Sequence, residues 1–233
     1  MRKIDPADVR VDFAQEVDEV IAYFDRVTVV LAGSAHEPGD LSRLAETTFL
    51  TVFVAFERFL SDLFLAYLNR QFSSYRSDLE NRVRQSIKER FGVWASQRMR
   101  LGKVHHVRVS DLEGIVDPNG HNLTFSSAND IKKKAEQWLA AVYNVRVQGL
   151  TAHDERVIDT ARAIRNFIAH GSTAARDSMN THLAAVMQGG QNAHLGRGVN
   201  EIQSAGFFLK TIIANQRRVV RYATRLREIS AVM

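Results

Sequence analysis

Residues 164–171 read Ile-Arg-Asn-Phe-Ile-Ala-His-Gly and close the segment that decides how this chain folds. Apolar residues lead into this stretch at three- and four-residue spacing, which predicts an amphipathic helix over about residues 153–170. Gly171 is typical of a helix C-terminal cap. Thr151 and Asp154 favour a helix start just upstream. The stretch is therefore expected to end a core helix.

Three polar side chains, Arg165, Asn166 and His170, interrupt this apolar pattern. Residues five apart on an ideal helix lie about 140° apart, so Arg165 does not directly neighbour His170. Asn166 lies one turn before His170, and Arg162 extends the same stripe. Imidazole transfers protons near neutral pH, and guanidinium stabilises an anionic phosphoryl group, so these residues suit metal-free phosphate chemistry. The alternative is that His170 only caps its helix and Arg165 packs over the core edge.

Residues 165–171 resemble the Arg-polar-x-x-x-His signature of the HEPN superfamily, whose members are small all-helical proteins and often metal-independent endoribonucleases. In that family the signature helix packs against an earlier helix rich in aromatic residues. Residues 49–67 contain Phe-Val-Ala-Phe-Glu-Arg-Phe and supply a matching helix. The resemblance covers about residues 41–175. The order of parts is most similar to the RiboL-PSP-like stand-alone prokaryotic HEPN proteins.

The resemblance implies a reaction in which the RNA 2′-hydroxyl attacks the adjacent phosphate. His170 would act as general acid or base, Arg165 would stabilise the pentavalent anion, and Asn166 would position the phosphate or the imidazole. It also implies a homodimer in which two signatures face one groove, with His170 near the two-fold axis. No metal or other cofactor is implied. The implied context is phage defence or a toxin–antitoxin system, with an antitoxin or defence protein as partner.

Two other classes of function remain open. The first is a HEPN-like binding or adaptor module without turnover, whose arginines hold RNA, a nucleotide or a protein partner. The second is a purely structural helical protein in which the signature only ends a helix. The role of His170 separates the binding module from the nuclease, because binding tolerates the loss of His170 and cleavage does not.

Glu57 is the one carboxylate expected against the aromatic stripe of the earlier helix, where it needs a cationic partner. Arg162 or Arg165 would serve. The contact is either a plain structural ion pair or a means of orienting the catalytic arginine. Arg162 shares the face of His170 more closely, whereas the family pattern favours Arg165, so the functional arginine is not settled by spacing.

Two basic groups are further candidates for RNA contact. One lies in the first turn of a helix, where positive charge is unfavourable, and this favours a use such as phosphate binding. The other shares one face of a C-terminal helix and is a candidate strip for a phosphate backbone. The alternatives are a solvated face and a favourable helix-dipole contact. The residues are Lys132, Lys133 and Lys134 in the first group and Arg218, Arg221 and Arg225 in the second.

Composition sets broad limits on function. The net charge of +5 permits a nucleic-acid partner, and the absence of cysteine excludes disulfides and thiolate chemistry. Residues 1–6 lack an apolar signal core. The most apolar run, residues 49–68, contains Glu57 and Arg58, so no membrane span is expected. These features favour a cytoplasmic protein.

The expected fold is all-α, a HEPN-like helical bundle with added N- and C-terminal helices in a single domain over residues 1–233. The HEPN-like core is expected at about 41–187 and an irregular insert at about 92–127. The helices bearing Phe49 and Arg165 are expected to be antiparallel. About six main helices are predicted, with expected segments at 5–32, 41–70, 77–90, from 127, at 153–170, at 174–187 and at 200–230.

Overall fold

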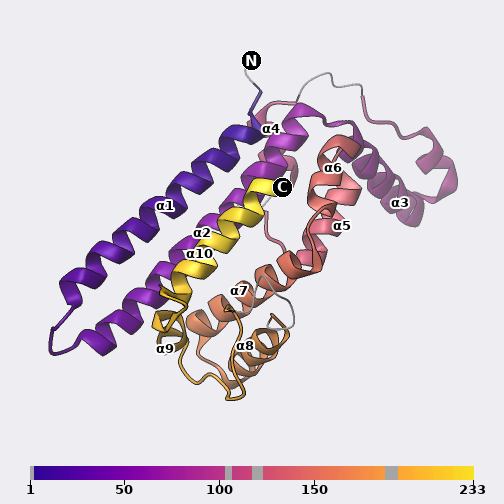
Figure 1. The fold of residues 1–233 in the computed structure, drawn as a ribbon. Helices are drawn as coiled ribbons and strands as arrows, with labels where there is room; N and C mark the ends of the chain where they lie inside the picture. The colour runs from indigo at the N-terminus through magenta and orange to yellow at the C-terminus, as the bar shows by residue number, and fades with distance from the viewer. Residues whose placement is uncertain (1–2, 103–106, 117–122, 187–193) are drawn as a thin grey trace.

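A computed structural model describes residues 3–102, 107–116, 123–186 and 194–233. Within these residues the chain is almost entirely helical, which confirms the all-α fold (Figure 1). The elements are α1 (Pro6–Leu31), α2 (Glu37–Arg70), α3 (Ser73–Arg98), α4 (Val109–Val116), α5 (Ala128–Trp138), α6 (Ala141–Gln148), α7 (Ala152–His170), α8 (Thr173–Val186), α9 (Ala205–Lys210), β1 (Ile212–Ile213), β2 (Gln216–Arg217) and α10 (Arg218–Val232).

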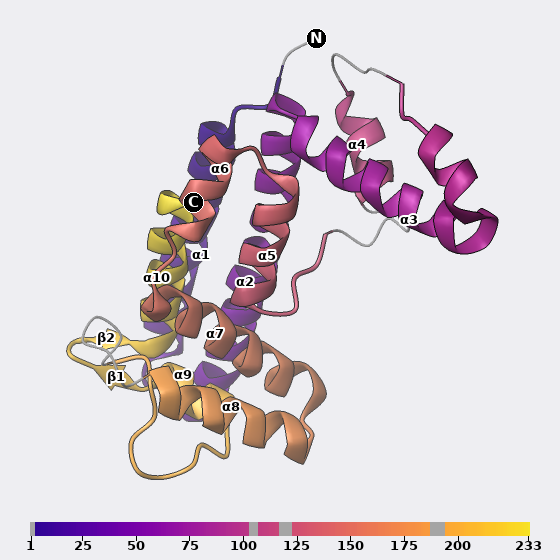
Figure 2. The same cartoon turned by 90° about the vertical axis from the view of Figure 1, so that its right-hand side faces the viewer.

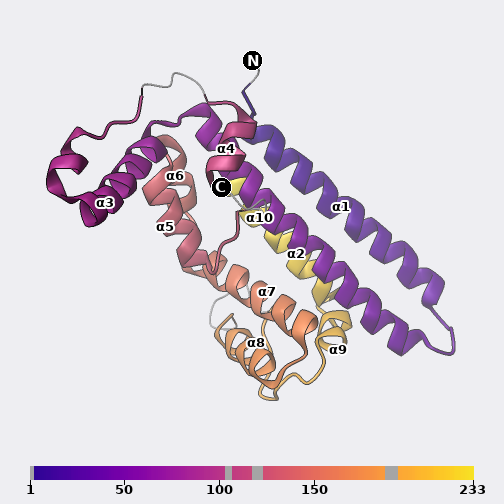
Figure 3. The ribbon, with the colours of Figure 1, turned by 180° about the vertical axis from the view of Figure 1, so that it is seen from behind.

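The long helix α2 lies at the centre, with α1 and α10 along its length (Figures 1 and 3). Its aromatic stripe is core, as predicted. Phe56 is fully buried with its ring 5.8 Å from that of Phe13 on α1. On the other side the ring of Phe49 meets Tyr222 of α10 edge-on at 5.6 Å. Among the described helices, none is both long and apolar enough to cross a membrane.

The helix boundaries follow local chemistry that the sequence made visible. The Asp5 carboxylate accepts the N–H of Ala7 at 2.9 Å at the start of α1. Ser127 caps α5 by accepting the N–H of Asp130. Gly171 ends α7 at φ 61° and ψ 7°, in the left-handed region that glycine adopts at low cost. The Gly171 cap was predicted, and the first two caps lie where helices were expected to begin, at residues 5 and 127.

Helix α2 begins earlier than predicted. The helix was predicted from residue 41, but it already starts at Glu37 and includes Pro38 and Gly39. Proline is compatible with the first helical turn because that turn's N–H groups have no partner inside the helix. The turn between α1 and α2 is confined to the residues just before, where Gly33 adopts φ 77°.

The predicted short helix at 77–90 is wrong in extent. Helix α3 runs from Ser73 to Arg98 and bends sharply at Gly92, where φ is 82° and ψ is 175°. The insert expected to be irregular at 92–127 therefore contains the last turns of α3 and the whole of α4. Residues 103–106 and 117–122 of that insert lie outside the described residues.

The single C-terminal helix predicted at 200–230 is also wrong. A short helix α9 and an antiparallel hairpin, with Ile212 opposite Arg217, precede α10. Ala214 and Asn215 form the hairpin turn with φ 46° and 63°. Positive φ at two successive residues is incompatible with a helix, so the apolar spacing upstream was misleading. Ile212, which lies in the segment predicted to be helical, is 58% exposed.

Helix α7 crosses α2 obliquely, in roughly the opposite sense along the chain (Figures 1 and 2). The expected antiparallel pair is thus a crossing, and the long lateral partners of α2 are α1 and α10 instead. Helix α8 lies along α7. Ala161 and Ile164 of α7 are fully buried in the same core cluster as the aromatic residues of α2. This packing sets which polar side chains of α7 reach α2.

Candidate functional site

The N-terminal end of α7 is fixed by a buried group of polar residues. The Asp154 carboxylate accepts hydrogen bonds from the Thr151 backbone N–H at 2.8 Å and its hydroxyl at 2.7 Å, and Thr151 caps the helix in return. The other oxygen of Asp154 pairs with the Arg225 guanidinium of α10. The two charged side chains are only 9% and 16% exposed. They tie α7 to α10 and were not predicted as a pair.

Glu57 of α2 lies between two arginines of α7. Its Oε1 is 3.5 Å from Nη2 of Arg162 and its Oε2 is 4.0 Å from Nη2 of Arg165. The three side chains are 26–34% exposed. The predicted contact of Glu57 is confirmed, and one carboxylate serves both candidate arginines. Two cations and one anion leave a formal charge of +1 that is accessible from solvent.

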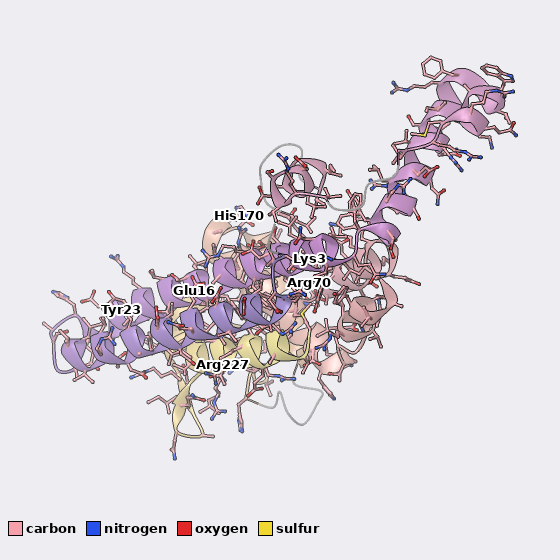
Figure 4. The ribbon with its side chains drawn as sticks, turned by 90° about the horizontal axis from the view of Figure 1, so that it is seen from above. Lys3, Glu16, Tyr23, Arg70, His170 and Arg227 are labelled. Carbon is pink, nitrogen blue, oxygen red and sulfur yellow. The ribbon has the colours of Figure 1, made fainter. Side chains whose placement is uncertain are left out.

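The same helix continues with the other two signature residues. Nη1 of Arg165 donates a hydrogen bond to Oδ1 of Asn166 at 3.2 Å. His170 occupies the last position of α7, exposed at the surface (Figure 4). Within the described residues its imidazole makes no hydrogen bond or ion pair. The helix end is capped by the backbone instead, since the Gly171 N–H donates to the Phe167 carbonyl at 2.9 Å. The imidazole is therefore available for an external group.

This arrangement offers anion-binding groups and a proton-transfer group on one helix. Arg162 faces one oxygen of Glu57, whereas Arg165 faces the other and also donates to Asn166 Oδ1. The remaining N–H groups of the two guanidinia can bind phosphate oxygens. Among the described residues there is no group of three or more side chains arranged to hold a metal ion.

The lysine group predicted for RNA contact is mostly used within the fold. Lys132 donates to the Leu150 carbonyl at 2.7 Å and pairs with Glu155 of α7. Lys134 lies 3.3 Å from the Asp130 carboxylate. Lys133 is the exposed one of the three. Lys132 thus links α5 to α7 and Lys134 pairs within α5, which gives these two charges a structural reason.

The arginine strip predicted on α10 does not present free guanidinia. Arg218 donates to the Phe208 carbonyl at 3.4 Å and lies 4.3 Å over the Phe208 ring. Arg221 donates to the Ile213 carbonyl at 2.8 Å, holding the hairpin. Arg225 pairs with Asp154. The three arginines do share one face of α10, as predicted, but that face contacts other parts of the fold.

A cavity of about 270 Å³ lies between α1, α2 and α4, away from the signature residues. Its polar lining is mostly acidic and includes Glu16, Asp62 and Glu113, with Arg58 as a cation. Burial raises the pKa of Asp62, Arg58 opposes that shift, and Glu113 adds to it. Carboxylates repel phosphate, so the end of α7 is the better candidate for an RNA site.

Comparison with known proteins adds no assignment to this geometry. No protein-family model, no curated protein and no solved structure matches the chain. The resemblance of residues 165–171 to the HEPN signature stays a prediction. The function is accordingly argued from the residues at the end of α7.

Proposed function

We propose that the protein is a metal-independent endoribonuclease that cleaves RNA by 2′-hydroxyl transesterification. The observation that supports it is that Glu57 holds Arg162 and Arg165 on the same helix, α7, that ends at the exposed imidazole of His170. In this reaction negative charge develops on the phosphate in the transition state. Guanidinia that are held in place stabilise this transition state more than they stabilise the bound substrate. The imidazole moves a proton at near-neutral pH.

In the proposed mechanism the 2′-hydroxyl attacks the adjacent phosphorus, and the bond to the 5′-oxygen of the next nucleotide breaks. The products are a 2′,3′-cyclic phosphate and a new 5′-hydroxyl. One proton leaves the 2′-oxygen and one reaches the 5′-oxygen. His170 performs one of these transfers, Arg165 and Arg162 bind the non-bridging oxygens, and Asn166 orients the phosphate.

The direct test is incubation of a structured RNA with the purified protein in excess EDTA, followed by analysis of product ends. The proposal expects fragments that carry a 2′,3′-cyclic phosphate and a 5′-hydroxyl. Uncleaved RNA at enzyme concentrations above that of the substrate would contradict it. Fragments with 3′-hydroxyl and 5′-phosphate ends would show a different chemistry.

Glu57→Gln is expected to lower kcat about tenfold, because the two guanidinia lose the carboxylate that holds them in place. RNA affinity is expected to hold or improve, since the local charge rises from +1 to +2. The free energy of unfolding should change by less than about 1 kcal/mol, because these side chains are about one-third exposed. Steady-state kinetics and urea denaturation measure both.

Glu16→Gln is the matched control, since Glu16 forms an exposed ion pair with Arg58 on the other side of α2. It removes the same charge without touching the candidate site. Equal kcat values for wild type and Glu57→Gln would show that the Glu57 contact is only a structural ion pair.

The proposal includes a homodimer, because one chain offers a single imidazole at the site and the reaction has two proton transfers. We expect the two His170 residues to lie close to the two-fold axis. The chain has no cysteine, so Ala169→Cys, at an exposed position, creates a single thiol. Mild oxidation should then give a covalent dimer on non-reducing gels. Ala22→Cys, exposed on α1, is the control expected to stay monomeric on the gel.

A second candidate function is an RNA-binding or adaptor module without turnover. It is favoured by one observation, namely that no described contact orients the His170 imidazole. In that case Arg162 and Arg165 bind the ligand and the histidine is dispensable. The role of His170 therefore decides between the two candidates.

A further inference from the structure

Helix α3 forms an arm that extends away from the rest of the molecule (Figures 2 and 4). Its first half packs on α5, and the chain then reverses at Gly92, whose φ of 82° favours glycine. Two arginines hold the returning segment. Arg84 Nε donates to the Met99 carbonyl at 3.2 Å, and Arg76 Nη2 donates to the Leu101 carbonyl at 2.6 Å. The tip is thus a built hairpin.

The tip exposes three large apolar side chains. Phe91 is 73% exposed, Trp94 69% and Val93 53%. The other tryptophan, Trp138, is only 9% exposed. Isolated exposed apolar residues are ordinary, but two exposed aromatic residues and a valine within four positions, at the end of a projecting element, mark a contact surface. No described element covers them.

The same segment is basic. Residues 78–100 contain six basic and three acidic residues, a net charge of +3. Arg82 and Arg84 pair with carboxylates one turn earlier on α3. The remaining basic residues have no carboxylate partner among the described residues, and they are Lys88, Arg90, Arg98 and Arg100. The Arg98 guanidinium lies 4.1 Å from the centre of the Trp94 ring.

We propose that this tip is a stacking platform for unpaired bases of single-stranded RNA. Aromatic side chains stack on bases of any identity, and surrounding cations follow the phosphate backbone. The guanidinium over Trp94 is placed to extend the stack. The concentration of charge favours a nucleic acid over an uncharged apolar partner. This inference rests on the proposed ribonuclease function, and it specifies unpaired RNA as the substrate.

The arm and the end of α7 are well separated (Figures 1 and 2). The arm therefore contacts RNA remote from the scissile phosphate. Its binding energy is available only to an RNA long enough to reach both places. Removing the arm's aromatic side chains should raise KM for long unpaired RNA and leave kcat unchanged. A short oligonucleotide bound only at α7 should be cleaved equally by both proteins.

The binding test uses the fluorescence of Trp94, since Trp138 is buried and supplies a constant background. The probe is 2′-O-methylated oligouridylate, which has no free 2′-hydroxyl and cannot be cleaved by the proposed reaction. Titration should quench the emission, and a 2′-O-methylated duplex of the same length should not. The double variant Phe91→Ala/Trp94→Ala, measured by fluorescence anisotropy of a labelled probe, should bind at least tenfold more weakly. Phe207→Ala is the control, because Phe207 is 64% exposed on α9 beside Lys210.

The outcomes separate this inference from the proposed function. Quenching of Trp94 without cleavage of ordinary RNA would retain the platform and reject the nuclease. Cleavage with unchanged KM for long RNA in the double variant would retain the nuclease and reject the platform. A wild-type oligomer that becomes smaller in the double variant, with RNA affinity unchanged, would show that the tip binds a second copy, and would also overturn the inference.

Discussion

His170→Ala is expected to lower the rate of RNA cleavage in EDTA by about 100-fold or more, the usual effect of removing a general acid or base. The side chain is exposed at the end of α7 and makes no described contact, so its loss should leave the fold intact. Single-turnover rates at saturating protein isolate the chemical step. Affinity for the uncleavable 2′-O-methylated RNA should be nearly unchanged, because Arg162 and Arg165 remain.

The matched control is His36→Ala, since His36 is an exposed histidine at the start of α2, outside the site. Circular dichroism of both variants should match the wild type. Wild-type cleavage by His170→Ala would reject His170 as the proton-transfer group. If neither protein cleaves RNA while both bind it, the adaptor function replaces the nuclease.

Asp154→Ala is expected to reduce the free energy of unfolding by about 3–5 kcal/mol. The substitution takes from the Arg225 guanidinium, only 16% exposed, its buried carboxylate partner and leaves it only the exposed Glu228. It also removes the reciprocal cap with Thr151, which alone contributes about 1 kcal/mol. Urea denaturation at neutral pH, followed by circular dichroism, gives the value.

Asp18→Ala is the control, because the Asp18–Arg227 pair also involves α10 but is 56% and 35% exposed. Its loss should cost less than about 1 kcal/mol. Adding Arg225→Met to Asp154→Ala should recover part of the lost stability, because a largely buried charge without its buried partner disappears. Equal destabilisation by Asp154→Ala and Asp18→Ala would contradict a buried ion pair. Arg225→Met alone should leave RNA affinity unchanged if the arginine is structural.

Local signals in the sequence were sufficient for most helices. The caps at Asp5, Ser127 and Gly171 need only their own side chains and the neighbouring backbone, so composition and spacing reveal them. The contact of Glu57 with α7 was also predictable. A carboxylate beside an apolar stripe requires a cation, and the facing helix offers two arginines.

The wrong predictions concern features that depend on contacts between residues far apart in the sequence. Arg225 was interpreted as part of a basic strip because its partner, Asp154, is 71 residues away in the sequence. The hairpin before α10 was hidden by apolar residues at helical spacing, although Asn215 was a signal for a turn. Phe91 and Trp94 were not singled out, since a sequence does not show that a helix projects beyond its neighbours.

The position of α2 between α1 and α10 also has a consequence for biosynthesis. α2 ends at Arg70, whereas its partner α10 begins only at Arg218, and the Tyr67 hydroxyl donates to the carbonyl of Met233. On a translating ribosome the aromatic face of α2 is therefore exposed for on the order of ten seconds before α10 is synthesised and can pack on it. During that time α1 shields only one side. Nascent chains should accordingly engage chaperones through α2, and slow synthesis of the later segment should increase aggregation.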